Sequence, residues 1–218
     1  LPVVFAMAIR YAQRNFSLEI AQKEVKAQKL QADLTQLRYQ LQPHFFFNAL
    51  NNIYSLIAFD PQKAQQSVHS LSKLMRHFMQ NSDQKQISLV EEVDFLQQYI
   101  NLMQLRLTDK TTVRVDFPKQ LPQLTIAPLL FISLVENAFK HGVSATEATE
   151  LSFSLRVEGN KVLFRSENTI IPTNESLYNS GIGIDNLKKR LRLLYPEKHQ
   201  YTVEEKDGKY IAQLTIKN

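Results

Sequence analysis

One histidine, His44, lies between Pro43 and three phenylalanines, in a stretch that otherwise has the pattern of a long helix. Proline inside a helix removes a backbone donor and clashes with the preceding turn, so a kink is expected beside the histidine. A neutral imidazole is available near pH 7 and can act as a nucleophile. A solvent-facing histidine next to a kink fits the same pattern, so the residue types alone leave both interpretations open.

The spacing of the side chains changes at this histidine. Apolar residues follow the 4-3-4 spacing of a two-helix seam before and after Pro43, but the step from Leu41 to Phe46 is five residues. On the other side, His44 and Asn48 begin a polar stripe with the same 4-3-4 step. Because residues at that spacing share one face of a helix, we expect His44 to point outward with Asn48 one turn away.

A nearly apolar segment at residues 127–141 is a second candidate for chemistry, and we predict that it is a helix closed by Gly142. Its polar residues form a stripe at 4-3 spacing with two neighbours beside it: Ser133, Asn137 and Lys140, with Glu136 and His141. Unpaired polar groups are costly to bury, so this stripe should face water or a charged ligand. The alternative is a helix end that borders solvent.

Two of the five glycines have no ordinary structural role. Gly181 and Gly183 follow a long polar loop, at about residues 168–180, and precede a predicted helix. Flexible backbone at the start of a helix lets amide groups and the helix dipole bind phosphate oxygens. A lone Gly-x-Gly is a weak signal, but together with the polar stripe it favours a nucleotide ligand.

Composition bounds the class of protein. The 218 residues are 44% hydrophobic and 22% charged, which suits one large or two small soluble domains. The net charge is +5, but the basic residues are scattered or lie near the start, whereas nucleic-acid binders cluster them on one surface. We therefore expect no nucleic-acid partner. Cysteine is absent, which excludes disulfides and thiolate metal sites.

The elements indicate an α+β fold in two parts. Residues 16–59 read as one long helix, Pro61 should begin a second, and the capping-box residues 88–91 should begin a third. Two helices joined by a short turn form a hairpin, and its leftover apolar surface would form a four-helix bundle on dimerisation. Five strands and two helices then predict an α/β sandwich, with a mixed sheet and helices on one face. The expected strands are at about 112–117, 149–157, 161–166, 200–205 and 210–216.

The first residues suggest a membrane connection. Nine apolar residues are too few to span a bilayer, but the basic residues that follow suit the cytoplasmic end of a membrane helix. The alternative is an ordinary amphipathic helix. We therefore expect residues 1–15 to be the end of a membrane span.

Three stretches together resemble the sensor histidine kinases of the LytS type. The phosphoacceptor segment of that family carries Gln-Pro-His-Phe-x-Phe-Asn-x-Leu-Asn, as residues 42–51 do here. Residues 134–142 look like the N box of its GHKL-type ATP-binding domain, and residues 181–187 look like its glycine box. The resemblance runs from about residue 30 to the end, and three motifs in the right order make a chance match improbable.

The resemblance implies a two-component kinase, which phosphorylates itself on His44 with ATP and then phosphorylates an aspartate in the receiver domain of a response regulator. Asn48 would orient the imidazole, and Glu136 would order water on Mg²⁺, although Glu136 could instead pair with Lys140 four residues on. Asn137 would supply an oxygen to Mg²⁺, a hard cation. The implied nucleotide-binding set is Asn137, Lys140, His141, Glu167, Asn168, Gly181, Gly183 and Asn186, of which Asn186 could equally cap or pack.

Two positions depart from patterns common among histidine kinases. Phe45 follows the histidine, where many histidine kinases have an acidic residue as the presumed base. The LytS-type motif also has phenylalanine at this position. Asn48 cannot take the proton of the imidazole, so the base is unassigned. Residues 165–169 contain no glycine, although an Asp-x-Gly-x-Gly box usually reads the adenine there. Either Glu167 or Asn168 could accept the adenine amino group, because each has a side-chain oxygen.

The resemblance also implies the domains and the setting. Residues 16–84 would be a coiled-coil linker with dimerisation and phosphotransfer helices, and residues 85–218 an ATP-binding catalytic domain. The protein should be a homodimer attached to the inner or plasma membrane through an upstream span, with this chain on the cytoplasmic side. The alternative function is a non-catalytic dimeric scaffold of the same fold, in which the altered adenine box leaves only dimerisation and partner docking.

Overall fold

The computed structural model describes residues 49–51, 53–81, 84–105, 107–171 and 182–218. The chain divides between residues 41 and 42, and everything described belongs to the second part. His44, Asn48 and Gly181 lie outside the described residues, as do the expected membrane end and most of the first helix. Residues 49–51 and 53–59, at the end of that predicted helix, are helical.

Two helix starts that the sequence predicts are confirmed. Helix α2 spans Pro61–Asn81, and the carboxylate of Asp60 accepts the backbone N–H of Lys63 at 3.0 Å. Helix α3 spans Leu89–Gln104 and begins with a complete capping box. In that box the hydroxyl of Ser88 accepts the N–H of Glu91 at 3.2 Å, and the Glu91 carboxylate accepts the N–H of Ser88 at 2.9 Å. Each cap satisfies backbone donors that a helix leaves unpaired.

The main sheet is mixed, as predicted, with strand order β2-β4-β5-β7-β6. Strands β2 and β4 are parallel and the other neighbours are antiparallel. The turns at Gly159 and at Asp207-Gly208 join antiparallel neighbours, and all three residues have the positive φ that tight hairpins need. The strands are β2 (Thr111–Asp116), β4 (Thr149–Glu158), β5 (Lys161–Thr169), β6 (His199–Lys206) and β7 (Lys209–Lys217).

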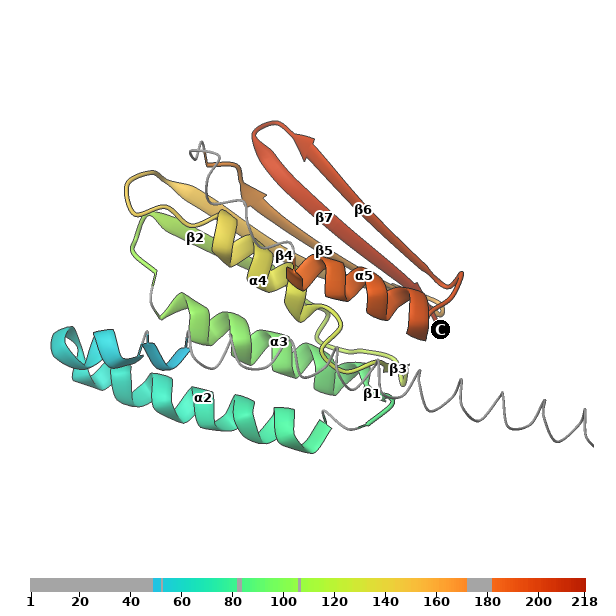
Figure 1. Cartoon of the computed structure of the whole chain (residues 1–218), viewed down its shortest axis with the longest axis horizontal. Coiled ribbons are helices and arrows are strands. Elements are labelled where there is room, and N and C mark those ends of the chain that lie inside the picture. The colour runs from blue at the N-terminus through green and yellow to red at the C-terminus, as the bar shows by residue number, and fades with distance from the viewer. Residues whose placement is uncertain (1–48, 52, 82–83, 106, 172–181) are drawn as a thin grey trace, which may run out of the picture. The chain divides into compact units, whose positions relative to one another are not determined.

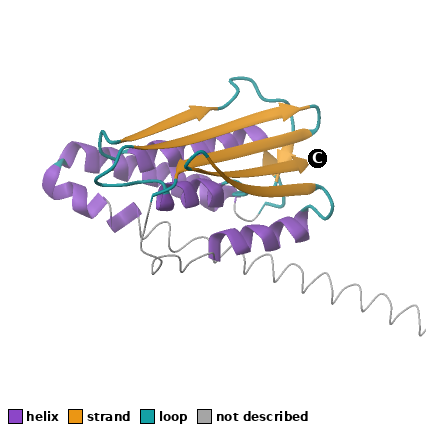
Figure 2. Ribbon diagram, turned by 90° about the horizontal axis from the view of Figure 1, so that it is seen from above, coloured by secondary structure: helices purple, strands orange, loops and turns teal. Residues whose placement is uncertain are grey.

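Helices α3, α4 (Ile132–His141) and α5 (Ile182–Leu194) lie on one side of this sheet (Figures 1 and 2). A small two-stranded sheet that the sequence did not predict pairs β1 (Ile87–Ser88) with β3 (Thr125–Ile126) and flanks the start of α3. The fold class, an α+β chain with a sheet covered by helices on one face, is confirmed.

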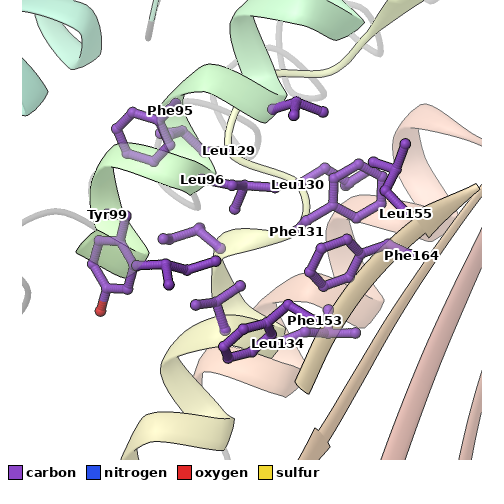
Figure 3. Close-up of a cluster of buried hydrophobic side chains, with 14 of the residues drawn as sticks. Phe95, Leu96, Tyr99, Leu129, Leu130, Phe131, Leu134, Phe153, Leu155 and Phe164 are labelled. Atoms are coloured by element: carbon purple, nitrogen blue, oxygen red, sulfur yellow. The ribbon is translucent and has the colours of Figure 1, made fainter. Parts of the chain in front are cut away.

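The core lies between α3 and the sheet, and aromatic rings fill much of it. Figure 3 shows Phe131 between Leu96 of α3 and Phe164 of β5. The Phe131 and Phe164 rings stack at 4.8 Å, and the rings of Phe139 and Phe153 stack at 5.7 Å, joining α4 to β4. Large buried rings supply most of the apolar area that stabilises such a layer. This packing fixes the distance of the helices from the sheet.

Helix α2 packs against α3, where the ring of His77 stacks on Phe95 at 5.1 Å. Burial lowers the pKa of His77, and the nearby carboxylates of Glu91 and Asp94 partly oppose this shift. The rest of α2 leaves large apolar side chains exposed, including Met79 at 73%. Within the described part of the chain, no helix has the length and apolar character needed to cross a bilayer.

Candidate functional site

Helix α4 carries the polar stripe that the sequence predicts. Its apolar residues are buried against α3 and the sheet, while Glu136 and Asn137 are half-buried and Lys140 is exposed. Ser133 is buried, and its hydroxyl has no hydrogen-bond partner among the residues that the structure describes. The helix thus presents oxygen and cationic groups together at the edge of the core, the mixture that a phosphate-bound metal ion requires.

Burial raises the pKa of Glu136 from its ordinary value of 4.5 to about 7. Its carboxyl group is therefore near half ionisation at neutral pH, and a cation placed beside it would favour the charged form. Burial, and to a lesser extent the charge of Lys140, lower the pKa of His141, so its imidazole is neutral near pH 7. Perturbed groups of this kind concentrate at functional sites, although structural groups show them too.

The end of α4 is packed tightly against the sheet. A Cβ atom on Gly142 would lie 2.5 Å from Asn168 Cβ and 2.5 Å from Leu151 Cδ2, closer than real Cβ atoms approach. The φ of Gly142 is −105°, so glycine is needed here for space and not for an unusual backbone conformation. Gly142 therefore lets the end of the stripe lie directly on β4 and β5.

Strand β5 separates the two residues that were alternatives for adenine recognition. Side chains alternate along a strand, and Asn168 falls with buried Phe164 and Ser166 on the helix-covered face. Asn168 is 3% exposed, and its amide donates to the carbonyl of Thr169 at 3.0 Å. Glu167 lies on the opposite face, where its carboxylate pairs with Arg165 at 2.8 Å. Only Asn168 therefore shares a face with α4.

Helix α5 places Gly183 and Asn186 in the helical layer that also contains α4. Gly183 lies in the first turn of the helix, and a Cβ there would meet no described residue within 4 Å. Asn186 is 3% exposed, and its side-chain nitrogen has no hydrogen-bond partner within the described parts of the chain. A buried donor without a partner is costly, so this amide is suited to an acceptor that the protein itself does not supply.

The predicted helix at 127–141 is wrong in its first five residues, because α4 begins only at Ile132. Leu129 has a φ of +57°, a left-handed conformation that ends any regular helix. The buried Glu92 carboxylate accepts the N–H groups of Leu129, Leu130 and Phe131, which therefore need no partners within a helix. The guanidinium of Arg190 donates to the carbonyl oxygens on the other side of this turn.

Sequence reasoning missed Glu92 and Arg190, although a signal was present. Glu92 lies beside Val93 on the apolar face of α3, and Arg190 lies beside Leu191 on the apolar face of α5. Charged residues of opposite sign on two buried helix faces predict a buried polar contact, because an unpaired buried charge is very costly.

A family model described as histidine kinase matches residues 32–111. The sensor histidine kinase YpdA of Escherichia coli is 32% identical over 192 residues, which cover 83% of this chain and 34% of the relative. The sensor protein LytS of Staphylococcus saprophyticus is 31% identical over 192 residues, covering 82% of this chain and 32% of the relative. The chain thus spans about a third of the length of the curated relatives that it matches.

Among solved structures, the histidine kinase domain of the Erythrobacter litoralis EL346 blue-light activated histidine kinase aligns over 88% of this chain and 94% of that chain, with a TM-score of 0.46 and 13% identity. The matches to the family model and to the curated relatives show that the chain belongs to the LytS-type sensor histidine kinases.

Proposed function

We propose that this chain is the kinase portion of a two-component sensor, which phosphorylates His44 with ATP and then phosphorylates an aspartate of a response-regulator receiver domain. The observation that carries the proposal is the polar edge of the helical layer. There the α4 stripe, the buried Asn168 and the Asn186 side-chain nitrogen, which has no partner among the described residues, belong to one side of the sheet. This arrangement of polar groups fits a nucleotide bound between the helices and the sheet better than it fits a purely structural core.

The donor groups of α4 fit Mg²⁺. Asn137 offers an amide oxygen and Glu136 a carboxylate of raised pKa, and both are hard oxygen donors. When bound, the ion would neutralise developing phosphate charge. Lys140, exposed at the end of the helix, would balance charge on the phosphates. Glu136 would be held in its ionised form by the nearby cation and would orient water around it.

The buried amides fit the remainder of a nucleotide. Asn168 would read the adenine amino group through its side-chain oxygen, on the face that Glu167 does not share. Asn186 would donate its free N–H to a nucleotide acceptor. Gly181 and Gly183 would let the backbone at the start of α5 approach the phosphates, and His141 would border the same site as a neutral ring.

The nucleophile would be the unprotonated ring nitrogen of His44. A bond forms between that nitrogen and the γ-phosphorus while the bond from phosphorus to the bridging oxygen breaks, and ADP leaves. Asn48, one helical turn away in the sequence pattern, would accept a hydrogen bond from the other ring nitrogen and so hold the ring in the reactive tautomer. The phosphohistidine then gives its phosphoryl group to the carboxylate of the receiver aspartate.

The helical hairpin would supply the dimer. Large apolar side chains remain exposed on α2 and on the preceding helical residues, where a second copy could cover them: Leu50, Tyr54, Ile57, Phe59, Val68, Met75 and Met79. A four-helix bundle formed by two hairpins would bury such a surface. We further propose that residues 16–84 form this linker and hairpin, that residues 85–218 form the catalytic domain, and that an upstream span holds the protein at the membrane.

The test is incubation of the dimeric protein with Mg²⁺ and ATP labelled in the γ-phosphate. The proposal predicts label that acid releases and alkali does not, and its loss in His44→Gln. A protein that binds ATP but takes up no label would refute the kinase function. Calorimetry with ATP and Mg²⁺ separates the scaffold alternative, which predicts no binding.

A further inference from the structure

The turn that precedes α4 is held by side chains from two other helices. The carboxylate of Glu92, on α3, accepts the N–H groups of Leu129 at 2.8 Å, Leu130 at 2.8 Å and Phe131 at 3.3 Å. The guanidinium of Arg190, on α5, donates to the carbonyl oxygens of Leu129 at 2.8 Å and Pro128 at 2.6 Å. We call this arrangement of Glu92, Arg190 and residues 128–131 the buried clasp.

The clasp is sealed from water and holds an unfavourable backbone conformation. Glu92 is 0% exposed and Arg190 is 2% exposed. Leu129 has a φ of +57°, a conformation that persists in a non-glycine residue only when its surroundings enforce it. Here its N–H group is bound from α3 and its carbonyl oxygen from α5. In addition, the N–H of Ala127 donates to the hydroxyl of Tyr195, beyond the end of α5, at 2.8 Å.

A buried carboxyl group and a buried guanidinium are an expensive way to fill a core. Apolar side chains of similar volume often stabilise a protein as well or better, so stability alone is weak grounds for such a pair. Hydrogen bonds to ionised groups are directional, and Arg190 makes two of them in a fixed fork. Directionality of this kind specifies the placement of one element relative to another.

The elements that the clasp joins are the two that carry the proposed nucleotide site. Helix α4 begins directly after the clasp and presents Glu136 and Asn137 in its second turn. On α5, Asn186 precedes Arg190 by four residues, which places it one turn away on the same helix face. A change in the clasp would therefore move the metal-binding stripe relative to the glycine-containing start of α5.

We propose that Glu92 and Arg190 are positioning residues, which fix the start of α4 against α5 and so set the geometry in which Asn137 and Asn186 meet one nucleotide. This inference rests on the proposed kinase function. Neither residue touches ATP in this account, because both side chains are turned to the backbone of the clasp. Their effect on ATP is therefore carried entirely by the placement of the two helices.

The test compares Arg190→Lys and Glu92→Gln with the wild type. Lysine keeps the positive charge but loses the two-pronged fork, and glutamine keeps the volume but replaces one acceptor oxygen of the carboxyl group with a donor nitrogen. Matched controls are Arg192→Lys, an exposed residue on the same helix, and Asp94→Asn, an exposed residue on α3. For each protein, circular dichroism first gives the folded fraction, and calorimetry then gives the affinity for ATP with Mg²⁺ at a temperature where the protein is folded.

Misplacement of reacting or binding groups by about 1 Å can cost up to about a hundredfold. We accordingly expect clasp variants that are folded to bind ATP about tenfold or more weakly, and the controls to bind like the wild type. Folded clasp variants with wild-type affinity would overturn the positioning role while leaving the kinase proposal intact. If the wild type itself binds no ATP, the proposed function and this inference fall together. If Arg190→Lys does not fold, the ATP affinity of Glu92→Gln alone tests the positioning role.

Discussion

Replacing Glu136 by glutamine should change how stability depends on pH. Burial raises the pKa of Glu136 from 4.5 to about 7 in the folded protein. Below pH 4.5 the carboxyl is protonated in both states. Between pH 4.5 and 7 the folded protein keeps a proton that the unfolded chain has released, so the free energy of unfolding falls as pH rises. Above pH 7 the full penalty for burying the carboxylate is present.

The size of this penalty follows from the pKa. One pKa unit corresponds to about 1.4 kcal/mol, so a rise from 4.5 to about 7 costs the folded state about 3 kcal/mol above pH 7. Glutamine has nearly the same shape and carries no charge at any pH. Glu136→Gln should therefore match the wild type near pH 4.5 and exceed its free energy of unfolding by up to about 3 kcal/mol at pH 8.

Urea unfolding of both proteins, measured from pH 4.5 to pH 8.5 without nucleotide or magnesium, tests this expectation. The control is Glu158→Gln, because Glu158 is exposed at the end of β4 and its carboxyl group is not buried. A stability difference between Glu136→Gln and wild type that stays constant across the pH range would refute the reasoning. Added Mg²⁺ and ATP should reverse the sign above pH 7, because the cation favours the charged carboxylate over the neutral amide.

Three further outcomes are expected. Gly142→Ala should lower the free energy of unfolding by about 1–3 kcal/mol, because the alanine Cβ has no room there. Gly183→Ala should not lower it, and urea unfolding midpoints of both variants test the comparison. Asn137→Ala should weaken ATP binding about tenfold with Mg²⁺ present and little without it, measured by calorimetry; equal loss in both conditions would contradict a metal-ligand role. Asn186→Leu should stabilise the nucleotide-free protein by about 1 kcal/mol while weakening ATP binding, since it removes an unpaired buried donor; unchanged affinity would argue against a nucleotide contact.

Local signals in the sequence predicted the elements whose ends are set by local chemistry. The capping box at Ser88 and Glu91 fixes the start of α3, and the turn at Asp207-Gly208 fixes the last hairpin. Alternation and hydrophobic spacing then located most strands and helices. These features depend on residues a few positions apart, which is why the sequence alone was sufficient to find them.

The rest depended on contacts between distant parts of the chain. Residues 127–131 have helical composition, but side chains from α3 and α5 bind their backbone and hold Leu129 in a left-handed conformation. Glu167 and Asn168 were equivalent as hydrogen-bond acceptors until the extension of β5 to Thr169 placed them on opposite faces. Likewise, only the structure shows that the Asn186 side-chain nitrogen has no hydrogen-bond partner among the described residues.

The central claim is that the nucleotide-binding layer and His44 serve one phosphoryl transfer. The most direct measurement is to digest the protein under alkaline conditions after reaction with ATP and Mg²⁺, and to locate the phosphoryl group by mass spectrometry. The account predicts phosphohistidine at His44, and its absence when Asn137 is replaced by alanine. A dimer that binds ATP and remains unmodified at His44, or carries the phosphoryl group on another residue, would contradict it.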